Sequence, residues 1–247
     1  MAGSKNRKRK VCCQVAIEGV FPLYLYTQSS KGDFDMKNKR ILLWALGMAV
    51  VLAISCASED SACAYTDRGE LLLDRGEYES AILDFTEAIR LNPNNTEAFL
   101  WRSRAHNRRG DFDLAIADLT QLIRIDPNNA TAFNNRGVQH ARRGDFDLAI
   151  ADYSQAIRLG PDSATTFRSR GYAHFRRGDF DLAIADFTQA IRINPNHAVT
   201  FDLRGQAHFD RGDYDLAAAD FEAALRIEPN WSGTRHDLER ARQRMGQ

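Results

Sequence analysis

Cysteine and lysine are scarce in this chain of 247 residues, and both are confined to its amino-terminal part. The four cysteines are Cys12, Cys13, Cys56 and Cys63. No cysteine follows Cys63, which excludes a disulfide framework for the body of the protein. All lysines lie within the first 39 residues, so the rest of the chain carries arginine in their place.

Signatures of catalysis are also missing from the sequence. It contains no G-x-S-x-G, no G-x-x-x-x-G-K-[ST] loop, no H-E-x-x-H and no C-x-x-C motif. Aspartate and histidine are abundant, but they recur at the same places in a repeated unit, whereas an active site is usually a singular arrangement. The sequence therefore predicts a protein that is not an enzyme, with no cofactor and no metal site.

The formal net charge of zero hides an uneven distribution. Residues 1–40 hold 9 basic and 3 acidic side chains, so the remainder is mildly acidic. An acidic body is a poor ligand for a polyanion, and we expect no nucleic-acid partner. The basic run from Lys5 to Lys10 is the one feature that favours nucleic acid, and it has no basic domain behind it.

Glycine and proline recur at intervals of 34 residues. The glycines of one position are Gly76, Gly110, Gly144, Gly178 and Gly212. The prolines of another are Pro93, Pro127, Pro161, Pro195 and Pro229. A fixed period of this length predicts a solenoid, because one unit cannot bury its apolar face alone and must stack on the next.

Each unit carries the pattern of two helices. In the third, Phe133, Gly137 and His140 share one helical face, and a second face of the same spacing begins at Ala149. We expect Gly144 to end the first helix in a left-handed conformation.

The second helix has its own boundary signals. Asp145 or Asp147 is expected to cap its start, and Pro161 to follow its end.

These units resemble the tetratricopeptide repeat, which has an aromatic residue at position 4, a small one at 8, Ala at 20, an aromatic at 24 and Pro at 32. Position 4 holds Tyr65, Phe99, Phe133, Phe167 and Phe201. Position 8 holds Gly69, Ser103, Gly137, Gly171 and Gly205. Position 24 holds Phe85, Leu119, Tyr153, Phe187 and Phe221. The resemblance implies an all-α, right-handed superhelical solenoid of five helix-turn-helix repeats. The repeats are 62–95, 96–129, 130–163, 164–197 and 198–231, followed by a polar capping helix over 232–247.

Two recurrent residues depart from the family pattern. Position 11 is histidine in four repeats: His106, His140, His174 and His208. We interpret these as packed replacements for an aromatic ring, because equivalent side chains on successive helices cannot converge on one metal ion. Position 7 is arginine and position 23 is aspartate in every repeat, which predicts a ladder of structural ion pairs.

The resemblance also implies a groove lined by positions 5 and 9 of each first helix, where the copies differ. The predicted peptide-binding residues are Arg104, Asn134, Val138, Arg168, Tyr172, Phe175, Arg176, Asp202, Gln206 and Phe209. Tyr172, Phe175 and Phe209 are expected to form an aromatic patch beside arginine, which is typical of binding hot spots. Alternatively, position 12, which includes both phenylalanines, packs between helices. Positions 23 and 29 stay constant although we expect them to lie outside the deep core. Exposure alone therefore does not explain why positions 5 and 9 differ between the copies.

The amino-terminal part predicts export. Residues 36–57 have the basic start, apolar run and small residues of a signal peptide or membrane anchor. Cys56 is a candidate for lipidation, while cleavage after Ala57 or Ala64 would release a soluble protein. Residues 1–35 precede this signal, and we interpret Met36 as the true start.

The sequence thus predicts an exported binding scaffold with a protein or peptide partner, located in the periplasm, on the outer membrane as a lipoprotein, or outside the cell. A membrane contact is expected only through the signal or lipid anchor. The alternative is an assembly factor that braces an envelope complex by self-association.

Overall fold

The computed structural model describes residues 61–246, and over this range the fold is entirely helical. The expected signal peptide, its Cys56 and the leader 1–35 lie outside the described residues. A first helix covers residues 61–74, and ten helices of 14 residues follow. They are α3 (Tyr78–Leu91), α4 (Thr96–Arg109), α5 (Phe112–Ile125), α6 (Ala130–Arg143), α7 (Phe146–Leu159), α8 (Ala164–Arg177), α9 (Phe180–Ile193), α10 (Ala198–Arg211), α11 (Tyr214–Ile227) and α12 (Ser232–Met245).

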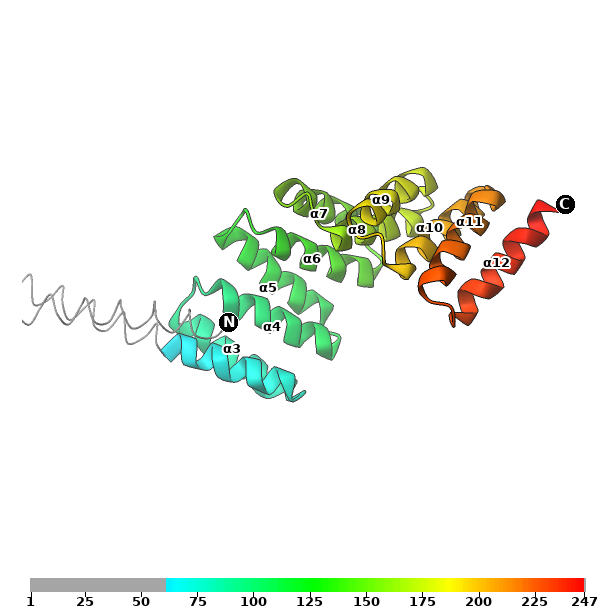
Figure 1. The fold of residues 1–247 in the computed structure, drawn as a ribbon. Coiled ribbons are helices and arrows are strands. Elements are labelled where there is room, and N and C mark those ends of the chain that lie inside the picture. Colours follow the sequence, from blue (N-terminus) through cyan, green and yellow to red (C-terminus); the bar gives the residue numbers. More distant parts are fainter. Residues whose placement is uncertain (1–60, 247) are drawn as a thin grey trace, which may run out of the picture.

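The helices stack in chain order from one end of the molecule to the other (Figure 1). Each packs on the helix before it and the helix after it, so the fold is the predicted all-α solenoid of helix pairs. In each pair we call the first member helix A and the second helix B. No helix among the described residues is long and apolar enough to cross a membrane.

Helices A and B approach closely because position 8 is small. At Gly137, a Cβ atom would lie 2.8 Å from the Tyr153 ring and 3.2 Å from the carbonyl oxygen of Ala149. Repeat two shows the compensating change, since Ser103 stands at position 8 and the smaller Leu119 replaces the ring at position 24. The side chain at position 8 and the ring at position 24 therefore share one space.

The turn from helix A to helix B is built as predicted at its glycine and differently at its aspartate. Gly144 has φ 85°, and its N–H donates hydrogen bonds to the carbonyl oxygens of Ala141 and His140. Asp145 precedes α7 but makes no side-chain capping bond, and Asp147 lies inside α7, so the predicted cap by either aspartate is wrong. The Asp145 carboxylate instead pairs with Arg143, at 3.2 Å from Nε.

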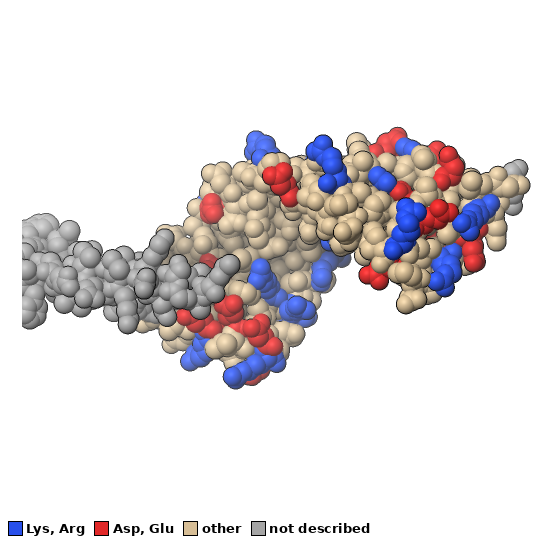
Figure 2. All heavy atoms as spheres, viewed as in Figure 1, with Lys and Arg blue, Asp and Glu red and all other residues tan. Residues whose placement is uncertain are grey.

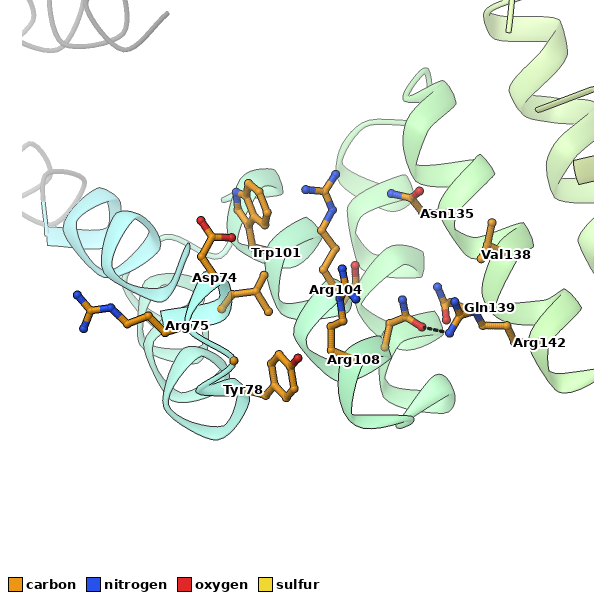
Figure 3. A pocket seen from close by; sticks show the side chains of 14 residues that line it. Asp74, Arg75, Tyr78, Trp101, Arg104, Arg108, Asn135, Val138, Gln139 and Arg142 are labelled. Atoms are coloured by element: carbon orange, nitrogen blue, oxygen red, sulfur yellow. Dashed lines mark hydrogen bonds between the residues drawn. The ribbon is translucent and has the colours of Figure 1, made fainter. Parts of the chain in front are cut away.

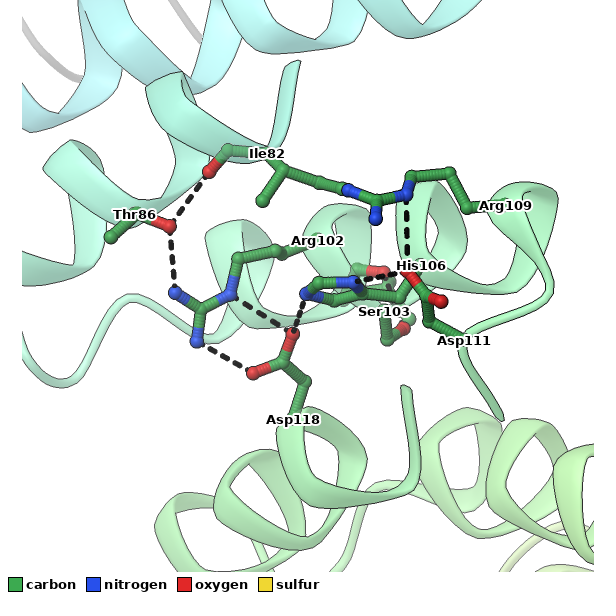
Figure 4. Close-up of polar contacts among 9 residues, drawn as sticks. Ile82, Thr86, Arg102, Ser103, His106, Arg109, Asp111 and Asp118 are labelled. Carbon is green, nitrogen blue, oxygen red and sulfur yellow. Dashed lines mark hydrogen bonds and ion pairs between the residues drawn. The ribbon is translucent and has the colours of Figure 1, made fainter. Parts of the chain in front are cut away.

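The predicted ladder of ion pairs is confirmed in all five repeats. Arg102 donates from Nε and Nη2 to the two carboxylate oxygens of Asp118, at 3.0 and 2.6 Å (Figure 4). The other pairs are Arg68–Asp84, Arg136–Asp152, Arg170–Asp186 and Arg204–Asp220.

The same arginines also join successive repeats. Nη1 of Arg102 donates to the Thr86 hydroxyl of the preceding repeat at 2.9 Å. Equivalent bonds lead from Arg136 to Thr120, from Arg170 to Ser154 and from Arg204 to Thr188.

The burial of position 23 corrects one expectation. Asp118 is only 5% exposed, and its equivalents are buried to the same degree. Position 23 is constant because it is a buried ion-pair partner, whereas Arg at position 29 is exposed as expected.

The histidines of position 11 pack beside this ladder. His106, His174 and His208 are buried, and His140 is half-buried. His106 lies with Nε2 3.9 Å from Asp118 and Nδ1 3.8 Å from Asp111 (Figure 4). Over residues 61–246 no group of three His, Cys, Asp or Glu side chains is arranged to hold a metal ion.

Helix α12 covers the last helix pair. Leu238 and Ala241 are buried against Ala217, Ala218 and Phe221 of α11. The opposite face of α12 is polar and exposed, as an open solenoid end requires.

Candidate functional site

The A helices line two adjoining hollows, which we call the groove. The first hollow has a volume of about 930 Å³ and lies between residues 73–78, α4 and α6. The second has a volume of about 460 Å³ and is lined by α6 and α8 together with single residues of α7 and α10. Val138 and Arg142 line both, so the two hollows form one continuous surface across successive repeats.

Arginine dominates the first hollow. Arg75, Arg104, Arg108 and Arg142 line it, against a single acidic residue, Asp74 (Figure 3). This local charge contrasts with the mixture of acidic and basic side chains over the face in Figure 2.

Two of these arginines are positioned by neutral partners. The guanidinium of Arg104 lies 4.4 Å from the centre of the Trp101 ring. Arg142 donates to the Asn107 side chain at 3.1 Å (Figure 3). It also lies over the Phe112 ring at 5.8 Å. Such contacts fix the direction of a guanidinium without neutralising its charge.

The second hollow combines three arginines with apolar side chains. Arg176 donates to the Tyr172 hydroxyl at 3.0 Å and lies 5.2 Å from the Phe146 ring. Arg168 is half-buried, and its Nη1 lies 3.0 Å from Nε2 of His197. Burial lowers the pKa of Arg168, because water is withdrawn from its charged form.

Five of the predicted site residues line the groove. They are Arg104, Val138, Arg168, Tyr172 and Arg176. Position 9 thus contributes from α4, α6 and α8, whereas position 5 contributes only Arg168 of α8. Tyr172 is 37% exposed, the largest exposure among the three residues of the predicted aromatic patch.

Three further predicted residues, Phe175, Gln206 and Phe209, line a separate hollow of about 240 Å³ beside α12. Phe175 packs on Phe180, with ring centres 5.9 Å apart, and Phe209 packs on Tyr214 at 5.2 Å. These contacts favour the packing alternative for position 12, so Tyr172 faces the groove without its two predicted aromatic neighbours.

Asp202 and Asn134 line none of these three hollows. Asp202 is buried, and its carboxylate accepts hydrogen bonds of 2.7 Å from Thr234 of α12 and from Gln206. Asn134 is half-buried on α6, and its Oδ1 has no hydrogen-bond partner among the described residues. The capping helix therefore contacts the carboxylate of Asp202, a residue that the sequence had placed in the groove.

Sequence reasoning missed other groove residues. They include Trp101, Asn135, Ser169 and Leu203 at position 6, and Arg108 and Arg142 at position 13. Position 6 varies between copies just as positions 5 and 9 do, so the same signal would have found it. At position 13 only Arg176 was predicted, and Arg108 and Arg142 were missed because this arginine recurs and resembles the structural ones.

The comparisons with known proteins agree with the helix-pair architecture. Models of the tetratricopeptide repeat match residues 66–130 and 134–198, and a further repeat model matches 198–231. No curated protein sequence gives a match.

Among solved structures, the chain is similar to MamA at 25% identity and a TM-score of 0.65, over 69% of this chain and 93% of that one. MamA 41-end from Desulfovibrio magneticus RS-1 gives 20% identity and a TM-score of 0.66, over 70% and 98%. YrrB, described as a TPR protein with an unusual peptide-binding site, gives 19% and 0.65, over 76% and 98%.

Proposed function

The chain belongs to the tetratricopeptide repeat family, and from this premise we propose that it is a non-catalytic scaffold whose groove binds a segment of another protein. One observation carries the proposal. The ladder residues at positions 7 and 23 are identical in all five repeats, whereas the groove residues at positions 5, 6 and 9 differ from copy to copy. A surface that only has to stack repeats has no need of such differences.

The form of the groove favours an extended ligand over a small molecule. Its two hollows adjoin at Val138 and Arg142, and together they cross several repeats. The axes of packed helices lie about 8–10 Å apart. An extended chain spans about 3.3 Å per residue, so roughly three residues cover each such step. Arginine, tryptophan and tyrosine, which line this surface, are the residues most enriched at interface hot spots.

Selection from a random dodecapeptide library displayed on phage, with the domain 58–247 as bait, tests this function. We expect enriched peptides whose affinity falls at least tenfold in Tyr172→Ala. Leu148→Ser is the matched control, because Leu148 is 54% exposed on α7 and lines none of the three hollows. Lack of enrichment, or equal losses in both variants, would contradict a peptide-binding groove.

One feature favours the alternative of self-association. Leu114, Leu148, Leu182 and Leu216 occupy the same position on successive B helices and are 51%, 54%, 51% and 47% exposed. Light scattering distinguishes the two functions: a monomer at all concentrations supports the peptide scaffold. A concentration-dependent oligomer that Leu148→Ser together with Leu182→Ser converts to monomer supports the alternative.

We propose in addition that the protein is exported by residues 36–57, with Cys56 or Ala57 at the processing site. The start of the first helix argues against the later cut after Ala64. Ala62 is 1% exposed, and its carbonyl accepts a hydrogen bond from the Thr66 hydroxyl at 2.9 Å. A cut after Ala64 would remove these contacts.

Fractionation of cells that express the chain from Met36 tests export. Membrane retention that is lost in Cys56→Ser supports lipidation, and a mature terminus directly after Ala57 supports a soluble periplasmic or secreted protein. A mature protein that begins at Tyr65, or retention in the cytoplasm, contradicts the proposal.

A further inference from the structure

Resting on the proposed function, we infer that the second hollow is a subsite for an internal Asp or Glu side chain of the bound segment. Arg168 is the central ligand of this carboxylate, and Arg142 and Arg176 flank it. The neighbouring residue of the segment is apolar and lies against Tyr172 and Leu203.

The charge of the hollow is the first support. Three arginines line it and no acidic residue does. Arginines of the same helices that serve the fold are compensated: Arg170 pairs with Asp186 at 2.7 Å, and Arg177 with Asp147 at 2.5 Å. The positive charge of the hollow is therefore specific to the side chains that face the groove.

Arg168 is the strongest single indication. Its contact is the imidazole of His197, and the pKa of that imidazole is itself lowered by burial and by Arg168, which favours the neutral ring. Among the described residues Arg168 forms no ion pair. A half-buried cation without a counter-charge has lost hydration, and a ligand carboxylate restores the lost interaction through charge-assisted hydrogen bonds.

The repeats themselves provide an internal comparison. Position 5 is Thr66, Leu100, Asn134, Arg168 and Asp202 in turn. Arginine stands there once, in the repeat whose position 9 is Tyr172. Stacking of repeats does not require this residue, because the equivalent positions stack with threonine, leucine or asparagine.

The flanking arginines are held in place before a ligand binds. Arg176 is fixed by the Tyr172 hydroxyl and the Phe146 ring, and Arg142 by Asn107 and the Phe112 ring. All four of these partners are neutral, so each guanidinium keeps its charge and loses little freedom on binding. Val138, Ala141 and Leu203 supply the apolar wall beside them.

The test uses peptides from the random dodecapeptide selection. We expect enrichment of Asp or Glu next to Leu, Ile or Phe. For the best synthetic peptide, Arg168→Gln should weaken binding at least tenfold. Replacement of the peptide's acidic residue by its amide should weaken binding to the same extent, and the two changes together should add little.

Arg192→Gln is the matched control, since it removes the same charge from an exposed site on α9 outside the groove. It should change affinity less than twofold. The melting temperature of Arg168→Gln should stay that of the parent, which separates loss of binding from loss of folding. Equal affinity for the C-terminally amidated and free-acid peptides identifies the internal carboxylate as the ligand.

Other outcomes overturn the inference. Enriched peptides without an acidic residue, whose binding depends on Tyr172 but not on Arg168, would contradict the carboxylate subsite and leave the peptide scaffold standing. Equal weakening by Arg168→Gln and Arg192→Gln would reduce the effect to general electrostatics. Binding that requires a free C-terminus would identify the terminal carboxylate of the peptide, and not an internal side chain, as the ligand of Arg168. No enrichment at all contradicts the scaffold itself.

Discussion

At the scale of the residue, one guanidinium group does two structural tasks. Arg136 binds Asp152 within its own repeat and Thr120 in the repeat before it. Asp152 is 6% exposed, so its charge is stabilised by this arginine more than by water. The constancy of both residues follows from this double contact.

Asp152→Ala should therefore lower the free energy of unfolding by about 2 kcal/mol, because it leaves Arg136 partly buried without its counter-charge. Urea denaturation of the domain measures the change. Asp162→Ala, an exposed carboxylate in the turn before α8, is the control and should have an effect below about 0.5 kcal/mol. Equal effects of the two substitutions would show that the ladder contributes nothing.

The contact between positions 8 and 24 gives a second prediction. Gly137→Ser should cost about 1–3 kcal/mol, because its side chain meets the Tyr153 ring. Adding Tyr153→Leu recreates the pair Ser103–Leu119 of repeat two, so the double variant should lose less stability than the sum of the two single changes. Additive losses in urea denaturation would contradict a shared space.

At the scale of the element, the A helices carry buried titratable rings. Burial lowers the pKa of His106, His140 and His208 in the folded state, and the ladder aspartate beside each ring opposes this lowering. The unfolded chain binds these protons more tightly. The stability that these neutral rings contribute is thus fully present above the unfolded histidine pKa of about 6.5. It is lost as the pH falls through the lower pKa values of the folded state.

The urea midpoint should accordingly be lower at pH 5.5 than at pH 7.5. Replacing the half-buried His140 by Phe removes one of the titrating rings and should make the difference between the two midpoints smaller. A difference unchanged by this substitution would assign the pH dependence to other groups.

The capping helix covers the apolar face of the last helix pair, so we expect its contacts to contribute to the stability of the whole domain. Leu238→Ser should destabilise the domain by about 2 kcal/mol or more, since Leu238 is 7% exposed against Ala217, Ala218 and Phe221 of α11. Met245→Ser, at a 55% exposed site of the same helix, is the control and should be neutral. Thermal denaturation followed by circular dichroism distinguishes them, and equal melting temperatures would argue against a cap.

At the scale of the whole molecule, the sequence predicted the architecture well because the residues that mark helix boundaries recur in every repeat. Gly144 and its equivalents end each helix A, and the Arg–Asp ladder follows from two constant positions. The site was harder to predict. Whether an arginine pairs or faces the groove depends on neighbours in the preceding repeat: Arg143 meets Asp113 there, whereas Arg142 meets Asn107 and Phe112. Asp202 is at position 5, which the family pattern places in the groove, but Thr234 of α12 covers it. The periodic pattern does not reveal that the capping helix packs where a further repeat would otherwise follow.

The uniform boundary between repeats has a consequence for how the gene can evolve. From the second repeat onward, Arg at position 7 donates to a hydroxyl of the preceding repeat, and Arg143, Arg177 and Arg211 each bind the Asp at the start of the preceding helix B. An in-frame duplication or loss of one whole repeat therefore recreates a boundary that the protein already has. A shorter insertion within a helix shifts every later residue off its face. Recombination can thus lengthen or shorten the recognition surface in whole steps, and point mutation can then give each new step its own ligand preference.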